Sequence, residues 1–150
     1  MSQIRIRAIA GLQPQDVFTV SRTFTDEDVN RFGEISKDYN PVHYNELFAA
    51  QKNFDGCICH GLLIGSMLTE IGGQIGWLAT EMTFKFKRPV YIGDRVTCTF
   101  TINSIDEKGY ASGKAEFTNQ NHTVVLTAQL KGIVPGRQER SLMKDSLSTA

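Results

Sequence analysis

Asp38, Asn40 and His43 lie within six residues of one another and have the side chains that acid–base chemistry requires. A carboxylate and an imidazole on one loop can share a water molecule, one taking a proton while the other gives or orients one. Pro41 stiffens this segment and holds Asn40 toward extended backbone geometry. The spacing therefore indicates a rigid loop that carries an acid–base pair.

A second polar group, Cys59-His60-Gly61, comes directly before a long apolar segment. If that segment is a helix, the backbone N–H groups at its start point outward and favour negative charge that develops on a bound molecule. The two groups together indicate acid–base chemistry beside an oxyanion site.

Ordinary structural roles compete with each of these interpretations. An Asp followed by Asn-Pro is common in turns, and His60 is suited to capping or bracing the apolar helix. Cys57, Cys59 and the two histidines suggest zinc, but Cys-x-Cys-His lacks the spacing of a structural zinc site and no second cysteine pair follows. We therefore predict no metal site, and on these residues alone both the catalytic and the structural interpretations stay open.

Composition excludes several classes of protein. The 150 residues are enough for one domain, and the 16 basic side chains are balanced by 16 acidic ones, whereas binding to nucleic acid favours a basic excess. The longest uncharged apolar region, 56–69, is too short to cross a bilayer, and residues 1–11 lack the apolar stretch of a signal peptide. Three cysteines, an odd number, do not suggest a disulfide framework. We expect a cytoplasmic protein without nucleic-acid or membrane partners.

A strand and two helices are predicted in the first third of the chain. The strand covers Val17–Phe24 and leads into a helix over Asp26–Ser36, for which Thr25 is the N-cap. A short helix follows over Asn45–Gln51. One face of the Asp26–Ser36 helix carries its apolar residues, which are Val29, Phe32 and Ile35.

The segment His60–Gly76 is apolar nearly all round the helical circle, which is typical of a helix buried on most sides. Its four glycines lower the intrinsic stability of a helix by roughly 1 kcal/mol each relative to Ala. We expect either a close approach of a sheet to this helix or an early end of the helix near Gly72.

The second half of the chain has the period of β-strands. Apolar and polar residues alternate in four segments, each predicted as a strand with one buried face: 82–86, 96–102, 111–117 and 124–130. Tight-turn residues at 106–109 and 119–121 indicate an antiparallel meander.

A helix buried on most sides, followed by a long antiparallel sheet, indicates that the sheet wraps around the helix. This is the hot-dog arrangement, an α+β fold. Such a sheet has edge strands, and pairing across a two-fold axis is a common way to cover them, so we expect a homodimer. We assign one domain to residues 1–134 and a polar tail, mobile or weakly helical, to residues 135–150.

The segment Ser36-Lys37-Asp38-Tyr39-Asn40-Pro41-Val42-His43, followed by Phe48-Ala49, resembles the hydratase signature of the MaoC-like (R)-specific enoyl-CoA hydratases. His60-Gly61-Leu62-Leu63 is similar to the family's segment that enters the central helix. Residues 84–90 and Gly93-Asp94 resemble the family's strand and the turn after it. The resemblance runs in order from about Phe18 to Val134, and Asp-x-Asn-Pro-x-His with a downstream His-Gly is specific in combination.

The resemblance implies a trans-2-enoyl thioester substrate, usually of coenzyme A, hydrated reversibly to the (R)-3-hydroxyacyl thioester without a metal or other cofactor. Asp38 and His43 would activate the water that adds at C3 and return a proton to C2, and the N–H of Gly61 would receive the thioester oxygen. Which of the two side chains makes each proton transfer stays open. The residues expected to contact the substrate are Asn40, His60 and Ser66, with Lys85 and Lys87 meeting the coenzyme A phosphates.

Three alternatives use the same fold. An acyl thioesterase usually has a carboxylate on the central helix, and Glu70 lies well past the start of that helix. A 3-hydroxyacyl dehydratase acting on acyl carrier protein would use the same chemistry on another carrier. A non-catalytic acyl-CoA-binding module would need neither Asp38 nor His43. The sequence leaves open the substrate chain length, the carrier and any assembly beyond a dimer.

Overall fold

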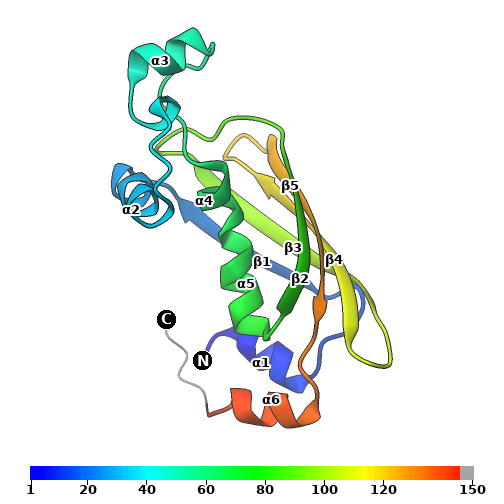
Figure 1. Cartoon of the computed structure of the whole chain (residues 1–150). Helices are drawn as coiled ribbons and strands as arrows, with labels where there is room; N and C mark the ends of the chain where they lie inside the picture. The colour runs from blue at the N-terminus through cyan, green and yellow to red at the C-terminus, as the bar shows by residue number, and fades with distance from the viewer. Residues whose placement is uncertain (146–150) are drawn as a thin grey trace.

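The computed structural model describes residues 1–145, so the last five residues of the predicted tail lie outside it. The described part of the chain forms helices and a five-stranded sheet (Figure 1). In order, the elements are α1 (Gln3–Ala10), β1 (Val17–Thr23), α2 (Asp26–Ser36), a 3-10 turn (Pro41–His43), α3 (Glu46–Gln51), α4 (Gly61–Gly65), α5 (Met67–Ile75), β2 (Leu78–Phe86), β3 (Arg95–Ile105), β4 (Tyr110–Thr118), β5 (Val124–Ile133) and α6 (Arg137–Met143).

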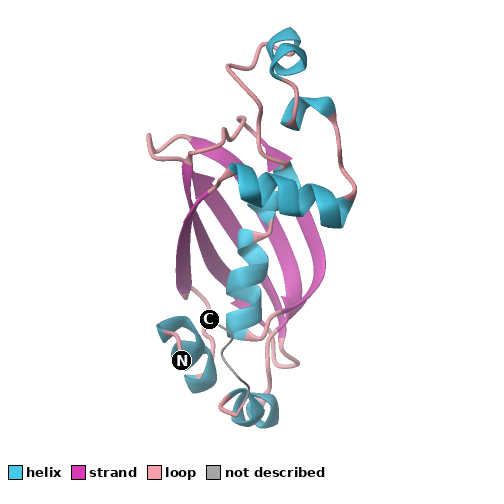
Figure 2. Cartoon of the chain, turned by 90° about the vertical axis from the view of Figure 1, so that its left-hand side faces the viewer, coloured by secondary structure: helices cyan, strands magenta, loops and turns pink. Residues whose placement is uncertain are grey.

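The sheet is antiparallel throughout and has the strand order β1-β3-β4-β5-β2. Its concave face lies against α4 and α5, as Figure 2 shows from the helix side. This arrangement confirms the predicted α+β hot-dog fold. The predicted meander is correct only for β3, β4 and β5. The first strand of the predicted meander, β2, does not neighbour β3. It pairs with β5 at the far edge of the sheet, where Phe84 lies opposite Ala128.

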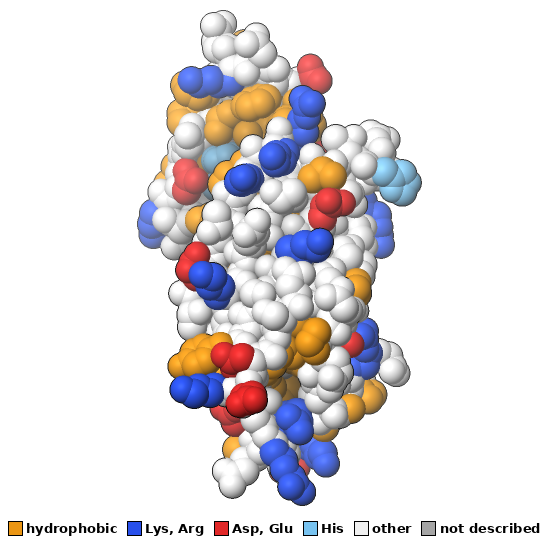
Figure 3. Space-filling model, turned by 90° about the vertical axis from the view of Figure 1, so that its right-hand side faces the viewer, with side chains coloured by type: hydrophobic (Ala, Val, Ile, Leu, Met, Phe, Trp, Pro, Cys, Tyr) orange, Lys and Arg blue, Asp and Glu red, His pale blue; other side chains and the backbone are white. Residues whose placement is uncertain are grey.

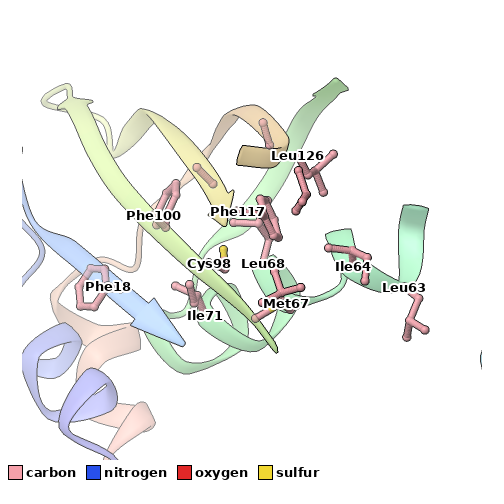
Figure 4. Close-up of a cluster of buried hydrophobic side chains, with 14 of the residues drawn as sticks. Phe18, Leu63, Ile64, Met67, Leu68, Ile71, Cys98, Phe100, Phe117 and Leu126 are labelled. Carbon is pink, nitrogen blue, oxygen red and sulfur yellow. The ribbon is translucent and has the colours of Figure 1, made fainter. Parts of the chain in front are cut away.

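The core fills the space between the inner face of the sheet and the central helices (Figure 4). Alternation along the strands places Phe18, Phe100 and Phe117 on that face, each 2% exposed or less. Opposite them lie the apolar side chains of the central helices, including Ile64, Met67, Leu68 and Ile71. Each such side chain contributes roughly 1.5–3 kcal/mol to folding when it leaves water, so this layer fixes where the start of α4 lies.

The predicted helix His60–Gly76 is two helices, α4 and α5, which meet at Ser66. Gly65 allows the close approach of the sheet, because a Cβ there would lie 3.1 Å from the Phe84 ring. The predicted end near Gly72 is wrong: α5 continues to Ile75 and ends at Gly76 in the left-handed conformation (φ 73°).

Other elements agree in part with the expectations. Thr25 caps α2, accepting a hydrogen bond from the Asp28 N–H at 3.3 Å, and the predicted bounds of this helix are confirmed. Ile35 does not share the buried face with Val29, because it is 84% exposed. Part of the polar tail forms α6, which lies beside α1 (Figure 1). Within residues 1–145, we find no helix with the length and hydrophobicity to span a bilayer.

Candidate active site

The loop that follows α2 positions Asp38 and His43. Helix α2 ends at Lys37 in the left-handed conformation, which turns the chain toward Asp38. The Asn40 side chain accepts a hydrogen bond from the Val42 N–H at 3.2 Å and so caps the 3-10 turn that ends at His43. Asn40 therefore holds the loop, while its side chain is not among those lining the neighbouring cavity.

His43 is fixed in one ring orientation and one neutral tautomer. Its Nδ1 lies 2.7 Å from the Ile58 carbonyl oxygen, and because a carbonyl only accepts, Nδ1 carries the hydrogen. The lone pair of the neutral ring is therefore at Nε2, which lies 3.7 Å from Oδ2 of Asp38. His43 is 8% exposed, whereas the Asp38 side chain is 48% exposed.

Burial lowers the pKa of His43 below its usual value of 6.5, because the protonated ring would lose solvation. The hydrogen bond to Ile58 opposes this effect, the nearby His60 adds to it, and the Asp38 charge opposes it. The neutral ring, with its lone pair facing Asp38, is therefore the dominant form near neutral pH. Such a ring can act as a general base.

Gly61 is the first residue of α4, so its N–H has no acceptor within the helix. A side chain at this position would overlap the ring of Phe86, which the edge strand β2 presses against the start of the helix. Glycine is thus required by a contact that spans 25 positions of sequence. The sequence predicts Gly61 as the oxyanion donor. It predicts Phe86 only as part of a buried strand face and not as the residue that contacts Gly61.

A cavity of about 600 Å³ connects these groups. Asp38, His43, His60 and Gly61 lie at its wall, and Lys87 and Arg88 line it as well. Most of the remaining surface is apolar and comes from α2, the loop before α4, α4 itself, β2 and β5. It includes Phe32, Phe54, Ile58, Leu62, Phe86 and Leu126. A polar wall on an apolar cavity suits a ligand with one reactive polar group on an apolar chain.

Asp38, His43 and His60 offer ligand atoms that all lie within 4.8 Å of one another, and two imidazoles with a carboxylate are a set that transition metals accept. The rings of His43 and His60, however, stack with centroids 3.9 Å apart and planes 30° apart. A metal ion lies near the plane of each imidazole that binds it, and two rings stacked in this way do not share such a position. The arrangement fits acid–base chemistry better than metal binding.

Besides Asn40, two residues predicted to contact a substrate, Ser66 and Lys85, do not line this cavity. The Ser66 hydroxyl donates to the Leu63 carbonyl at 2.6 Å, so it bonds to the backbone of its own helix turn. Lys85 alternates with Phe84 and Phe86 and therefore faces the outer side of the sheet, where it lines a polar groove. Figure 3 shows that outer face, with basic side chains scattered among uncharged ones. Lys87 lines both the groove and the cavity.

Comparison with known proteins agrees with this geometry. Residues 12–140 match the family model described as "MaoC like domain". The chain is 31% identical over 124 residues to the (R)-specific enoyl-CoA hydratase of Rhodospirillum rubrum, covering 79% of this chain and 85% of the relative. It is 28% identical over 130 residues to the mitochondrial 3-hydroxyacyl-[acyl-carrier-protein] dehydratase of Arabidopsis thaliana, covering 83% and 78% of the two chains.

Among solved structures, the chain is similar to the (R)-hydratase from A. caviae involved in PHA biosynthesis, with a TM-score of 0.77 and 28% identity over 83% of this chain and 98% of the other. The order of elements, the loop that carries the carboxylate–imidazole pair and the match over 12–140 all point to the same group of proteins. This chain belongs to the MaoC-like domain family.

Proposed function

We propose that this protein is an (R)-specific enoyl-CoA hydratase, a hydro-lyase that adds water reversibly to trans-2-enoyl-CoA and forms (R)-3-hydroxyacyl-CoA. The observation that carries the proposal is the pairing of the Asp38 carboxylate with the unprotonated Nε2 of His43, 3.7 Å apart at one wall of an apolar cavity. Family relatives named for this reaction support it.

The proposed reaction begins with a water that donates one O–H to Asp38 and the other to Nε2 of His43, since both are acceptors. The water oxygen then attacks C3 of the enoyl group. As the C3–O bond forms, the O–H bond toward His43 breaks, its proton passes to Nε2, and the C2=C3 π electrons move into the thioester enolate. His43 returns the proton to C2, which restores the neutral ring. Asp38 orients the water, and its charge stabilises the transient imidazolium.

Gly61 supplies the proposed oxyanion contact. Its N–H, at the start of α4 and at the cavity wall, donates to the thioester oxygen as this oxygen gains enolate charge. One such donor is worth about 2.7–4 kcal/mol of transition-state stabilisation, a factor of about 10²–10³ in rate. No covalent enzyme intermediate and no redox step is needed, because every proton and electron pair returns to its starting group or enters the product.

The mechanism predicts a specific pH dependence. Hydration needs neutral His43, so kcat/KM should fall as pH drops through the pKa of His43 and the ring becomes protonated. Because burial lowers that pKa, the midpoint of the fall should lie below pH 6.5, the usual pKa of histidine. Initial rates of crotonyl-CoA hydration between pH 4.5 and 8 measure this. A rate that instead rises as pH falls through this range would mean that protonated His43 is the reactive form.

The closest competing activities differ in the carrier or the bond broken. A dehydratase acting on acyl carrier protein, as one relative is named, would use the same residues on another carrier. Thioester hydrolysis has less support, because Glu70, the carboxylate of the central helix, is exposed and does not line the cavity. An acyl-CoA-binding module would have no use for the paired Asp38 and His43.

One assay separates these activities. With purified protein and crotonyl-CoA, the loss of enoyl absorbance should proceed without the release of free thiol. Thiol release at a comparable rate would indicate a thioesterase, and binding without either change would indicate a non-catalytic module. Replacing crotonyl-CoA by crotonyl-acyl carrier protein compares the two carriers.

Lys87 gives a test of phosphate recognition. Because Lys87 lines the cavity and Lys85 faces away from it, Lys87→Glu should raise KM for crotonyl-CoA severalfold with little change in kcat. The effect should shrink as salt is raised, since the distance over which exposed charges attract falls from about 10 Å at 0.1 M to about 3 Å at 1 M ionic strength. Lys85→Glu is the matched control. Equal increases in KM for the two variants would contradict a specific contact at Lys87.

We further propose a cytoplasmic homodimer. Strand β2 forms one edge of the sheet, and large apolar side chains on and near it are exposed in the single chain: Leu62 is 59%, Leu78 65% and Phe86 59% exposed. A second copy that pairs with this edge would cover them. The three unpaired cysteines support a reducing compartment. The mass in solution, twice that of one chain, serves as the assembly control for the variants proposed here.

A further inference from the structure

His60 connects the central helix to the loop that carries Asp38. It is the N-cap residue of α4 and is 1% exposed. Its Nε2 lies 2.9 Å from the Asp38 carbonyl oxygen, so Nε2 carries the hydrogen and donates it. Among the described residues, the other hydrogen bonds of Asp38 join it only to Ser36 and Asn40. The His60 bond is therefore the one that ties Asp38 to a distant part of the fold.

The ring of His60 also fixes the ring of His43. The two imidazoles stack with centroids 3.9 Å apart. Phe32 from α2 and Tyr44 contact His60 as well, with centroid distances of 4.9 and 5.9 Å. Tyr44 is held in turn, because its hydroxyl donates to the Val29 carbonyl at 3.2 Å. Two aromatic side chains thus hold His60 in place while it packs against the face of His43.

His60 does not use its full hydrogen-bonding capacity. Within residues 1–145, its Nδ1 is buried and has no hydrogen-bond partner. A buried acceptor left without a partner lowers the stability of the fold, a loss that an apolar ring at the same position would avoid. Simple bracing of α4 needs no imidazole, whereas the donor to Asp38 and the contact with His43 both lead to the reacting groups.

We infer that His60 is a positioning residue of the proposed hydratase, which sets the position of the Asp38 backbone through its Nε2–H and the ring plane of His43 through stacking. The inference rests on the proposed function. It goes beyond the sequence-based expectation of a substrate contact, because His60 acts through the two catalytic side chains and not on the substrate.

Two substitutions separate the effect of the hydrogen bond that His60 donates from the effect of its aromatic ring. His60→Phe keeps an aromatic ring against His43 and removes the donor to Asp38. His60→Gln removes the ring and keeps an N–H that can reach the Asp38 carbonyl. A misplacement of about 1 Å can cost about 100-fold in rate, so we expect His60→Phe to lower kcat for crotonyl-CoA roughly 10- to 100-fold with KM nearly unchanged. His60→Gln should recover a large part of that loss.

The pH profile is a readout that a merely structural role would not move. Burial is the main cause that lowers the pKa of His43, and the nearby His60 lowers it further. His60→Gln, which removes the second imidazole and leaves a polar side chain, should therefore raise that pKa and shift the acid limb of kcat/KM to higher pH. Neither variant changes the other charged or titratable groups that line the cavity with His43 or contact its ring, which are Asp38, Tyr44, Cys59, Lys87 and Arg88. Two results would overturn the inference: an acid limb that is not shifted in His60→Gln, or a kcat of His60→Phe equal to that of the unaltered protein.

The same question can be answered without turnover. The pKa of His43, followed by NMR of its ring protons, should be higher in His60→Gln than in the unaltered protein even if the protein acts on a different substrate. An equal pKa in the two proteins would contradict the close contact between His60 and His43 on which the inference depends, independently of the proposed reaction. If His60→Phe does not fold, His60→Gln alone provides this measurement.

Discussion

Asp38→Asn should lower the rate of crotonyl-CoA hydration by about 10²–10⁴-fold, the range associated with one general acid–base group. The amide has the size of the carboxylate and its oxygen can still accept the hydrogen bond from the Asn40 N–H. It lacks the charge that stabilises the imidazolium, however, and its NH₂ group would donate to the water or to Nε2 of His43. The water would then lose its orientation for attack. The initial rate at saturating substrate measures the loss in kcat.

Asp55→Asn is the matched control, because Asp55 is also exposed and its side chain does not line the cavity. It should keep the activity of the unaltered protein. Both variants should retain the dimer mass and the unfolding temperature, since the changed side chains are largely in water. Turnover of Asp38→Asn within a few-fold of the unaltered protein would remove Asp38 from the mechanism.

His43→Asn should cause a loss of the same order, about 10²–10⁴-fold, for a different reason. The Asn side chain can place its NH₂ near the position of Nδ1 and keep the hydrogen bond to the Ile58 carbonyl, so the loop retains its anchor. It has no basic atom at the position of Nε2 and cannot take the proton from water. His43→Ala should be equally inactive and, having lost the anchor, less stable.

His122→Asn is the control for this change. His122 is exposed, does not line the cavity and has a left-handed backbone conformation (φ 60°) that Asn tolerates well. It should leave kcat unchanged. If His43→Asn kept substantial activity, and kept an acid limb in its pH profile, another group would have to be the base.

The residues that act together could be predicted where they are close in sequence. Asp38 and His43 are five positions apart on a loop with Pro41, and local backbone preferences nearly determine their proximity. Thr25 and the bounds of α2 could be predicted for the same reason, because a cap and its helix are local. Strand alternation likewise predicted which side chains of β3 are buried.

Contacts between distant segments could not be predicted from these patterns. Strand β2 pairs with β5 because of the path that the chain takes between strands. The alternation of apolar and polar residues within β2 does not determine which strand is its neighbour. That pairing presses Phe86 onto Gly61. The role of His60 also depends on a tertiary contact, because its ring bonds to a carbonyl 22 positions away. Ser66 differs, because its hydroxyl bonds locally to the backbone of its own helix turn.

The stereochemistry of water addition tests the central claim most directly, because Asp38 and His43 lie on one side of the cavity and His43 both takes and returns the proton. When trans-crotonyl-CoA is hydrated in D₂O, deuterium should enter C2 from the same face as the oxygen at C3. Proton NMR of the 3-hydroxybutyryl product should then show a single diastereomer, identified by the coupling between the C2 and C3 protons. The opposite diastereomer, or an equal mixture of the two, would contradict proton return by the group that activates the water.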